Sequence, residues 1–109
     1  MCNRFRGVES LADLPRYFDY GPPINFEFNP NVAPTESVPV LLATRGESPR
    51  IQLARFGIAM NPGPDGKKRP PLLNSRLDTL HKGSFKTGVA NHHCVIPAQG
   101  FYEWREEDG

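Results

Sequence analysis

Short runs of apolar residues, rather than long helical stripes, dominate the pattern along this chain and predict mainly β-strands. Residues 38–43 are apolar and contain β-branched side chains, which is typical of a buried strand. Residues 51–60 alternate apolar and polar positions and predict a second strand, joined to the first by a turn-forming connection. Residues 93–98 and 101–104 predict two further strands, interrupted at Gly100.

Two segments have the apolar spacing of short helices. Ser10 is a suitable N-cap for a helix over residues 11–18, which ends before a Gly-Pro-Pro sequence. Asn74 or Ser75 begins a second short helix that extends through residues 77–80. The chain contains no internal repeat, so these elements belong to one unit.

Composition limits the fold to a single loop-rich domain. The chain has 109 residues, of which 12 are proline and 10 are glycine, and 38% are hydrophobic. No apolar run approaches the length of about 18 residues needed to span a membrane, and no signal peptide opens the sequence. We therefore expect a cytoplasmic protein of bacterial type with no membrane contact, in which Cys2 and Cys94 are free thiols rather than a disulfide.

Charge is distributed unevenly, although the net charge is only +1. Residues 61–90 carry six basic side chains against Asp65 and Asp78, whereas acidic residues gather at 103–108. A basic middle segment can form a phosphate-binding face, and it can equally be a solvated loop with exposed lysines. Charge alone leaves both interpretations open.

Cys2 is the most distinctive residue because it directly follows the initiator Met1. Removal of Met1 leaves one residue that carries both a free α-amine and a thiol. Such a pair on adjacent carbons closes a five-membered ring onto an aldehyde, and holding both groups on one residue gives them a high effective concentration. An aldehyde-bearing substrate is therefore the first chemical hypothesis.

Four short motifs add to this terminal cysteine, and together they carry a family resemblance. They are MCNRF at residues 1–5, NVAP at 31–34, NSRLDT at 74–79 and CVIPAQGFYEW at 94–104. In this order they resemble the SOS-response-associated peptidase (SRAP) family, whose pattern is M-C-G-R-F, N-V-A-P, W-G, N-A-R-x-E-T and C-x-x-P-A-x-G-F-Y-E-W. The resemblance covers the whole chain.

The resemblance implies that the protein senses abasic sites in single-stranded DNA and associates with the nucleoid when bound to it. The processed Cys2 would attack the aldehyde of the ring-opened sugar and end as a thiazolidine cross-link that shields the lesion. No cofactor is implied. A zinc site at Cys94 with His92 and His93 is disfavoured, because adjacent histidines cannot both point to one side of a strand and no second cysteine has CxxC spacing.

The resemblance also assigns roles to four further residues. Glu103 matches the family's catalytic glutamate, half-buried between two aromatic residues and placed to move protons; the alternative is an exposed carboxylate in an acidic tail. Asn74 matches the active-site asparagine, whose alternative role is a helix cap. Arg76 and Arg4 match residues expected to contact DNA phosphates, although a lone arginine is often only a surface charge.

The chain departs from the family pattern at several positions. Asn3 replaces the usual glycine, and its side chain would crowd an approaching nucleic-acid backbone. Phe56 replaces the usual tryptophan, and Asp78 replaces the usual glutamate. The family's active-site histidine lies in a later His-x-Arg-Met-Pro-like segment, which these 109 residues do not contain.

We therefore expect residues 1–109 to be the amino-terminal part of one SRAP-like domain. The final Asp108-Gly109 pair, typical of a hairpin turn, has no returning strand after it. The expected fold is α+β, with mainly antiparallel strands that curve into a barrel-like sheet and short peripheral helices. Two other functions remain open: a cysteine peptidase that removes its own leader, and a non-catalytic fragment that binds single-stranded DNA.

Overall fold

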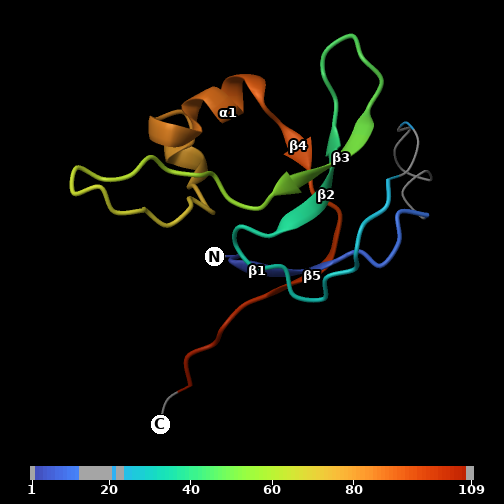
Figure 1. Cartoon of the computed structure of the whole chain (residues 1–109), viewed down its shortest axis with the longest axis horizontal. Helices are drawn as coiled ribbons and strands as arrows, with labels where there is room; N and C mark the ends of the chain where they lie inside the picture. The colour runs from blue at the N-terminus through green and yellow to red at the C-terminus, as the bar shows by residue number, and fades with distance from the viewer. Residues whose placement is uncertain (1, 13–20, 22–23, 108–109) are drawn as a thin grey trace.

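Two small antiparallel sheets organise the part of the chain that the structure describes, which is residues 2–12, 21 and 24–107 of a computed structural model (Figure 1). The first sheet pairs β1 (Arg4–Gly7) with β5 (Ala98–Tyr102). The second sheet has the order β3-β2-β4, in which β2 is Ser37–Leu42, β3 is Arg50–Arg55 and β4 is Cys94–Val95.

β2 is the central strand of its sheet and confirms the buried strand predicted at residues 38–43. It pairs with β3 along its whole length. Its residues 38–41 are buried, with Val38 and Val40 in one hydrophobic cluster and Leu41 in another. Apolar neighbours on both faces of a strand explain why its hydrophobic run is continuous rather than alternating.

The second predicted strand, at residues 51–60, is shorter than expected. β3 ends at Arg55, because the backbone turns at Gly57, which has a φ of 102°. Beyond this turn, Ile58 pairs with Leu72 through two backbone hydrogen bonds of 2.9 and 3.0 Å. The intervening segment therefore forms a loop that is closed at its base.

The interruption predicted at Gly100 is wrong. Gly100 lies inside β5 and pairs with Arg6 of β1. The break falls instead between β4 and β5, at Pro97, because proline has no N–H to continue the ladder. The register shifts between Arg6 and Gly7, so that Gln99 is an extra residue in β5, a β-bulge.

Two clusters of buried side chains make up the core, one on each face of β2. They are Phe5, Val32, Val38 and Val40 in the first, and Leu11, Leu41 and Ile51 in the second. Phe5 attaches β1 to the first cluster: its ring meets Phe56 edge to face at 5.1 Å, and its carbonyl accepts a hydrogen bond of 2.7 Å from the Val32 N–H. The first cluster therefore joins the two sheets.

The strand pairs are antiparallel throughout, as predicted, but the described residues do not close into a barrel. β5 pairs with β1 alone, and β4 pairs with β2 at only two positions, Leu41 opposite Val95 and Leu42 opposite Cys94. No continuous ladder of hydrogen bonds therefore links the sheets. The fold is α+β, with two open sheets in place of the expected barrel-like sheet.

The predicted helices are only partly observed. Ser10 Oγ accepts a hydrogen bond of 3.1 Å from the Ala12 N–H, as an N-cap does, but most of the helix predicted at 11–18 lies outside the described residues. The helix predicted at 77–80 is a 3₁₀ turn over Leu77–Thr79, which begins after Arg76 without a side-chain cap. Neither candidate cap of that element therefore acts as one.

A second 3₁₀ turn, Gly83–Phe85, leads into the short helix α1 (Lys86–Asn91). The sequence does not predict α1, because its residues Lys-Thr-Gly-Val-Ala-Asn include several weak helix formers and no apolar stripe. No helix among the described residues has both the length and the apolar character needed to cross a membrane.

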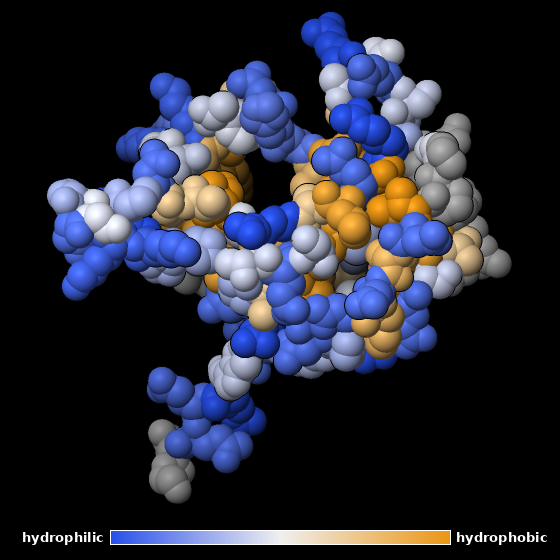
Figure 2. All heavy atoms as spheres, in the orientation of Figure 1, coloured by the Kyte–Doolittle hydropathy of each residue, from blue (hydrophilic) through white to orange (hydrophobic). Residues whose placement is uncertain are grey.

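The chain exposes more surface than a compact domain of its mass. Its accessible surface is 8739 Å², against about 6,100 Å² for a compact monomer of 12.2 kDa. Large apolar side chains contribute to this excess on and beside β5, where Phe101 is 69% exposed and Trp104 is 73% exposed. The space-filling view shows hydrophobic groups interspersed with polar ones across the visible face (Figure 2).

Gly57→Ala is expected to destabilise the fold more than Gly46→Ala. Both glycines have a positive φ, of 102° and 83°, so each alanine adds backbone strain of about 1–2 kcal/mol. A Cβ at position 57 would also lie 3.0 Å from Leu73 Cδ2 and 3.0 Å from Pro71 Cβ, whereas one at position 46 has nothing within 4 Å.

Urea unfolding, followed by circular dichroism, measures the difference between the two variants. We expect Gly57→Ala to be the less stable by about 1–3 kcal/mol, which is the usual cost of overpacking. Equal free energies of unfolding would show that the contact of Gly57 with the returning chain does not fix the loop.

Candidate functional site

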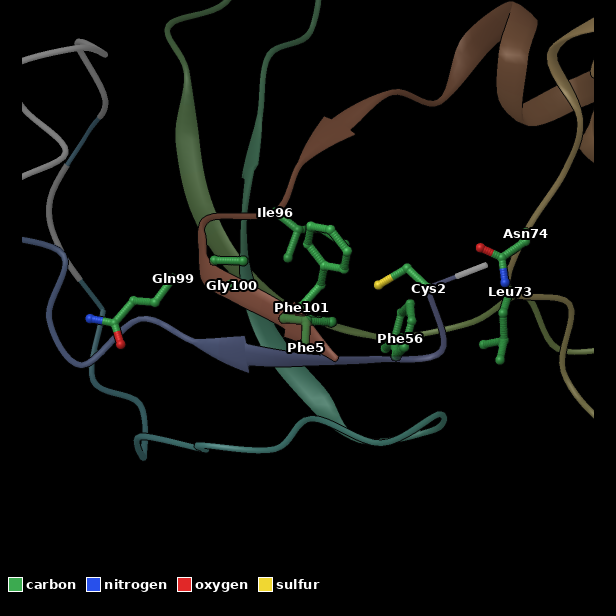
Figure 3. A pocket seen from close by; sticks show the side chains of 10 residues that line it. Cys2, Phe5, Phe56, Leu73, Asn74, Ile96, Gln99, Gly100 and Phe101 are labelled. Atoms are coloured by element: carbon green, nitrogen blue, oxygen red, sulfur yellow. The ribbon is translucent and has the colours of Figure 1, made fainter. Parts of the chain in front are cut away.

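An open pocket lies between the amino-terminal end of the chain and the wall formed by β5 (Figure 3). Its volume is about 520 Å³. Most of its lining is apolar, contributed by Phe5, Phe56, Leu73, Ile96 and Phe101. Of the five site residues predicted from the sequence, Cys2 and Asn74 line this pocket, and the other three do not.

Cys2 is half-buried, just before β1, and packs against the first core cluster. Its thiol donates a hydrogen bond of 3.5 Å to the carbonyl oxygen of Arg4. In the close-up view the sulfur points into the space in front of the Phe101 and Phe56 rings (Figure 3). The thiol is therefore presented to the pocket from a position just before β1, the short strand that Phe5 anchors to the core.

Asn74 also lines the pocket, on the same side as Cys2 (Figure 3), and is held by Asn3. Its Nδ2 donates a hydrogen bond of 2.8 Å to Asn3 Oδ1, across 71 positions of the sequence. The sequence predicts that the Asn3 side chain crowds an approaching nucleic-acid backbone; the structure shows a contact that was not predicted, with Asn74. Because Asn3 follows Cys2, the same hydrogen bond holds the segment that carries the thiol next to the segment that carries the Asn74 amide.

The bulged residue Gln99 faces away from Cys2 (Figure 3). Its Oε1 accepts a hydrogen bond of 2.8 Å from Arg6 Nε, and Arg6 also forms an ion pair of 3.0 Å with Glu9. The Arg6 guanidinium lies 4.9 Å from the centre of the Phe28 ring. This network fixes the bulge in β5 and leaves the Cys2 side of the pocket mainly apolar.

Glu103 directly follows β5 and is exposed, so the half-burial predicted for it is not observed. The flanking aromatic rings do not enclose it, since Tyr102 is 39% exposed and Trp104 is 73% exposed. The Tyr102 hydroxyl instead donates a hydrogen bond of 2.7 Å to the Pro30 carbonyl, which fixes the end of β5. Glu103 therefore lies beside the pocket, at the start of a segment that runs away from the sheets (Figure 1).

Both predicted phosphate-contacting arginines have partners within the chain. Arg4 Nη1 donates a hydrogen bond of 3.5 Å to Asn31 Oδ1. Arg76 Nε and Nη2 donate to the two carboxylate oxygens of Asp78 at 3.1 and 3.2 Å. The Arg76 and Asp78 side chains are 79% and 63% exposed, and such exposed pairs contribute only about 0–1 kcal/mol. A phosphate can therefore replace Asp78 as the partner of Arg76 at little cost.

The second cysteine lies apart from this site. Cys94 is exposed in β4, opposite Leu42, and both it and Cys2 are free thiols. Within the described ranges, no group of three or more histidine, cysteine, aspartate or glutamate side chains is arranged to hold a metal ion. The chemistry available in the pocket is thus that of a thiol, an amide and, once Met1 is removed, an α-amine.

Sequence reasoning missed the apolar part of the lining and the contact between the two asparagines. Phe56, Leu73 and Ile96 come from three separate segments that meet only in the folded chain. The one available signal was that each flanks or lies within a motif. Nothing in the local pattern indicates that Asn3 reaches Asn74.

Asn3→Leu is expected to raise the rate at which iodoacetamide alkylates Cys2, because loss of the hydrogen bond to Asn74 releases the segment that carries the thiol. An exposed hydrogen bond worth about 0.5–1 kcal/mol corresponds to a roughly two- to fivefold change. Mass spectrometry of the peptides gives the rate at each cysteine, and Cys94 serves as an internal control.

The matched variant is Asn3→Asp, which keeps an acceptor oxygen for the Asn74 amide and should leave the Cys2 rate near that of the parent. Equal rates in the Leu and Asp variants would contradict a positioning role for this hydrogen bond.

Comparison of the sequence with known proteins places this chain in a family. The model of the family described as SOS response associated peptidase (SRAP) matches residues 1–109. The abasic site processing protein YoaM of Bacillus subtilis (strain 168) is 29% identical over 112 residues, a match that covers 99% of this chain and 49% of that protein. The abasic site processing protein YoqW of Bacillus phage SPbeta is 30% identical over 112 residues, covering 99% and 50%.

No solved structure matches the chain with comparable significance. The chain spans about half the length of the curated relatives that it matches. The family model nevertheless matches the chain from its first residue to its last, so the protein belongs to the SRAP family.

Proposed function

We propose that this protein captures abasic sites in single-stranded DNA covalently through Cys2, after removal of Met1. The observation that carries the proposal is the Cys2 thiol at an open pocket that the Asn74 amide also lines, beside it. The names of relatives, abasic site processing proteins, supply the substrate class. The ring-opened form of an abasic sugar carries the aldehyde that an aminothiol requires.

The proposed reaction joins one aldehyde to the aminothiol of Cys2 and releases one water. The α-amine attacks the aldehyde carbon, and the resulting carbinolamine loses water to give an imine. The thiol then adds to the imine carbon while its proton passes to the nitrogen, which closes a thiazolidine ring. The sequence of steps needs no oxidant or reductant. The apolar lining favours the dehydration step, because it limits access of water to the imine.

Asn74 and Glu103 assist in this proposal through hydrogen bonds and proton transfer. The Asn74 amide, fixed by Asn3, orients the amine or a hydroxyl of the sugar. Glu103 moves protons during formation and loss of the carbinolamine. Glu103 is exposed just after the end of β5. For it to reach the reacting groups in this proposal, the bound strand has to cover that end of β5.

The surface around the pocket favours a single strand over a duplex. The exposed rings of Phe101 and Trp104 provide faces on which unpaired bases can stack, which contributes about 1–3 kcal/mol per base. Arg4 and Arg76 lie outside the pocket and contact the phosphates on either side of the lesion in this proposal. A duplex keeps its bases stacked inside and would leave both rings exposed.

Two other functions have some support. A non-catalytic role in binding single-stranded DNA is favoured by the exposed rings of Phe101 and Trp104, on which bases can stack whether or not the strand carries a lesion. A thiol peptidase is favoured by the family description, with the same Cys2 thiol as its nucleophile. Loss of Met1 in a host without methionine aminopeptidase activity would support self-cleavage over ordinary processing.

Cys2→Ala is expected to abolish a heat-stable adduct with a single-stranded oligonucleotide that contains one abasic site. The parent protein, confirmed by intact mass to lack Met1, should form that adduct, because only this residue carries both nucleophiles. Denaturing electrophoresis separates the adduct from free DNA. Cys94→Ala is the matched control and should react like the parent. An adduct of equal yield in the Cys2→Ala variant, or none in the folded parent, would overturn the proposal.

Glu103→Gln is expected to slow adduct formation by about 100-fold or more, the usual contribution of a positioned proton-transfer group. Glu106→Gln removes a neighbouring exposed carboxylate and should leave the rate unchanged. Rates are compared at saturating DNA, so that binding does not limit them. If the two variants react equally fast, Glu103 has no part in the chemistry.

A further inference from the structure

The loop closed by the pair of Ile58 and Leu72, residues 58–72, forms a projection that we call the basic arm. Two backbone hydrogen bonds of 2.9 and 3.0 Å join Ile58 and Leu72 at its base. The arm extends away from both sheets, past the side of the molecule that carries α1 (Figure 1). Gly57, just before the base, sets its direction through the turn described above.

The basic arm is ordered internally rather than held by neighbours. At its tip, Gly63 N–H donates to the Lys67 carbonyl at 3.0 Å, and Gly66 N–H donates back to the Gly63 carbonyl at 2.9 Å. Asp65 Oδ1 accepts a hydrogen bond of 3.0 Å from the Lys67 N–H. Four prolines, at positions 62, 64, 70 and 71, restrict φ on both sides of this tip. A surface ordered in advance loses less entropy when it binds a partner.

Three consecutive cations occupy the tip. Lys67, Lys68 and Arg69 are exposed, and within the described part of the chain none of them forms an ion pair. They line a hollow of about 570 Å³ together with Asp65 and residues of the two proline-containing segments. Asp65, whose carboxylate also accepts the Lys67 N–H, carries one negative charge against these three positive charges and so offsets only part of them. The hydrophilic projection is visible in Figure 2.

The base of the arm is continuous with the wall of the Cys2 pocket. Phe56 precedes the arm and lines the pocket, and Leu73 and Asn74 follow the arm and also line it. The cations and the pocket are therefore carried on one stretch of chain with a hydrogen-bonded base.

We propose that the basic arm is a second DNA-contacting surface, which binds phosphates of the strand several nucleotides away from the lesion in the Cys2 pocket. The inference extends the proposed function and takes its partner class from it. Clustered lysine and arginine side chains bind nucleic-acid backbones largely without regard to sequence. The tip offers no large apolar side chain on which a folded protein partner could anchor, so the observations favour a phosphate backbone over an acidic peptide.

The test is reversible binding of lesion-free oligonucleotides, measured by fluorescence anisotropy over a range of salt concentrations. The variant Lys67→Gln/Lys68→Gln/Arg69→Gln removes the three cations of the arm. Oligonucleotides of about five and about fifteen nucleotides separate pocket binding from an extended path, since single-strand sites cover roughly 4–16 nucleotides. The control variant Arg45→Gln/Arg55→Gln/Lys82→Gln removes three exposed cations elsewhere.

For the longer oligonucleotide, the arm variant should lower the slope of log affinity against log salt by about 2, which is about 0.7 for each of three lost contacts. The slope should change much less when the arm variant binds the shorter oligonucleotide, and when the control variant binds either one. Equal losses in the arm and control variants, or equal losses for both lengths, would overturn the inference. Displacement of DNA from the parent by polyglutamate, with no length dependence of DNA binding, would overturn it in favour of an acidic peptide.

Adduct formation with a short abasic oligonucleotide, measured in parallel, separates this inference from the proposed function. The arm variant should retain that reaction, because it leaves the Cys2 pocket intact. If the parent forms no adduct but the arm variant still loses length-dependent binding, covalent capture fails and the arm remains a DNA-binding surface. If the parent forms the adduct and the arm variant binds the longer strand as the parent does, only the arm inference fails.

Discussion

The burial of Phe5 is the interaction on which the pocket depends. β1 is four residues long, and β5 is its strand partner among the described residues, a two-stranded pair that by itself is marginally stable in water. Single backbone hydrogen bonds also join Phe5 to Val32 and Gly7 to Asn29. Phe5 is 6% exposed, and burial of such a side chain contributes about 1.5–3 kcal/mol. Because Cys2 and Asn3 lie immediately before β1, this one ring holds both the thiol and the acceptor of the Asn74 amide in place.

How far the sequence predicts this fold depends on whether local pattern or distant contacts decide each element. β2 is predictable because both of its faces are buried, and a continuous apolar run records that directly. β3 ends early because of the backbone conformation at Gly57, which apolar alternation does not encode. Gly100 has the composition of a break but lies within a strand, since its partner Arg6 is 94 positions earlier in the chain and invisible to local reasoning.

The candidate site, like the fold, has some features that a local pattern predicts and others that depend on distant contacts. Cys2 and Asn74 belong to short motifs, and the fold brings both to one pocket. The half-burial predicted for Glu103 assumes that its neighbours Tyr102 and Trp104 enclose it, but both rings are exposed, and a local pattern does not show how much of each ring the fold covers. The chain is also less compact than its length predicts: its radius of gyration is 16.0 Å, against about 13 Å for a compact chain of this length. Relatives contain about as much chain again outside the matched half.

The composition of the pocket explains why charge has to be placed outside it. Among the residues that the structure describes, no lysine or arginine lines the Cys2 pocket, and an apolar lining by itself does not attract a polyanion. Arg4 and Arg76 are already bonded to Asn31 and Asp78, so a phosphate must compete with these partners. The cations of the basic arm form no ion pair among the described residues, although Asp65 lines the same hollow. In the proposed function, attraction and chemistry therefore use different surfaces: the exposed cations of the arm attract the phosphates of the strand, while the apolar pocket would limit access of water to the imine. Their common stretch of chain, from Phe56 to Asn74, connects the two.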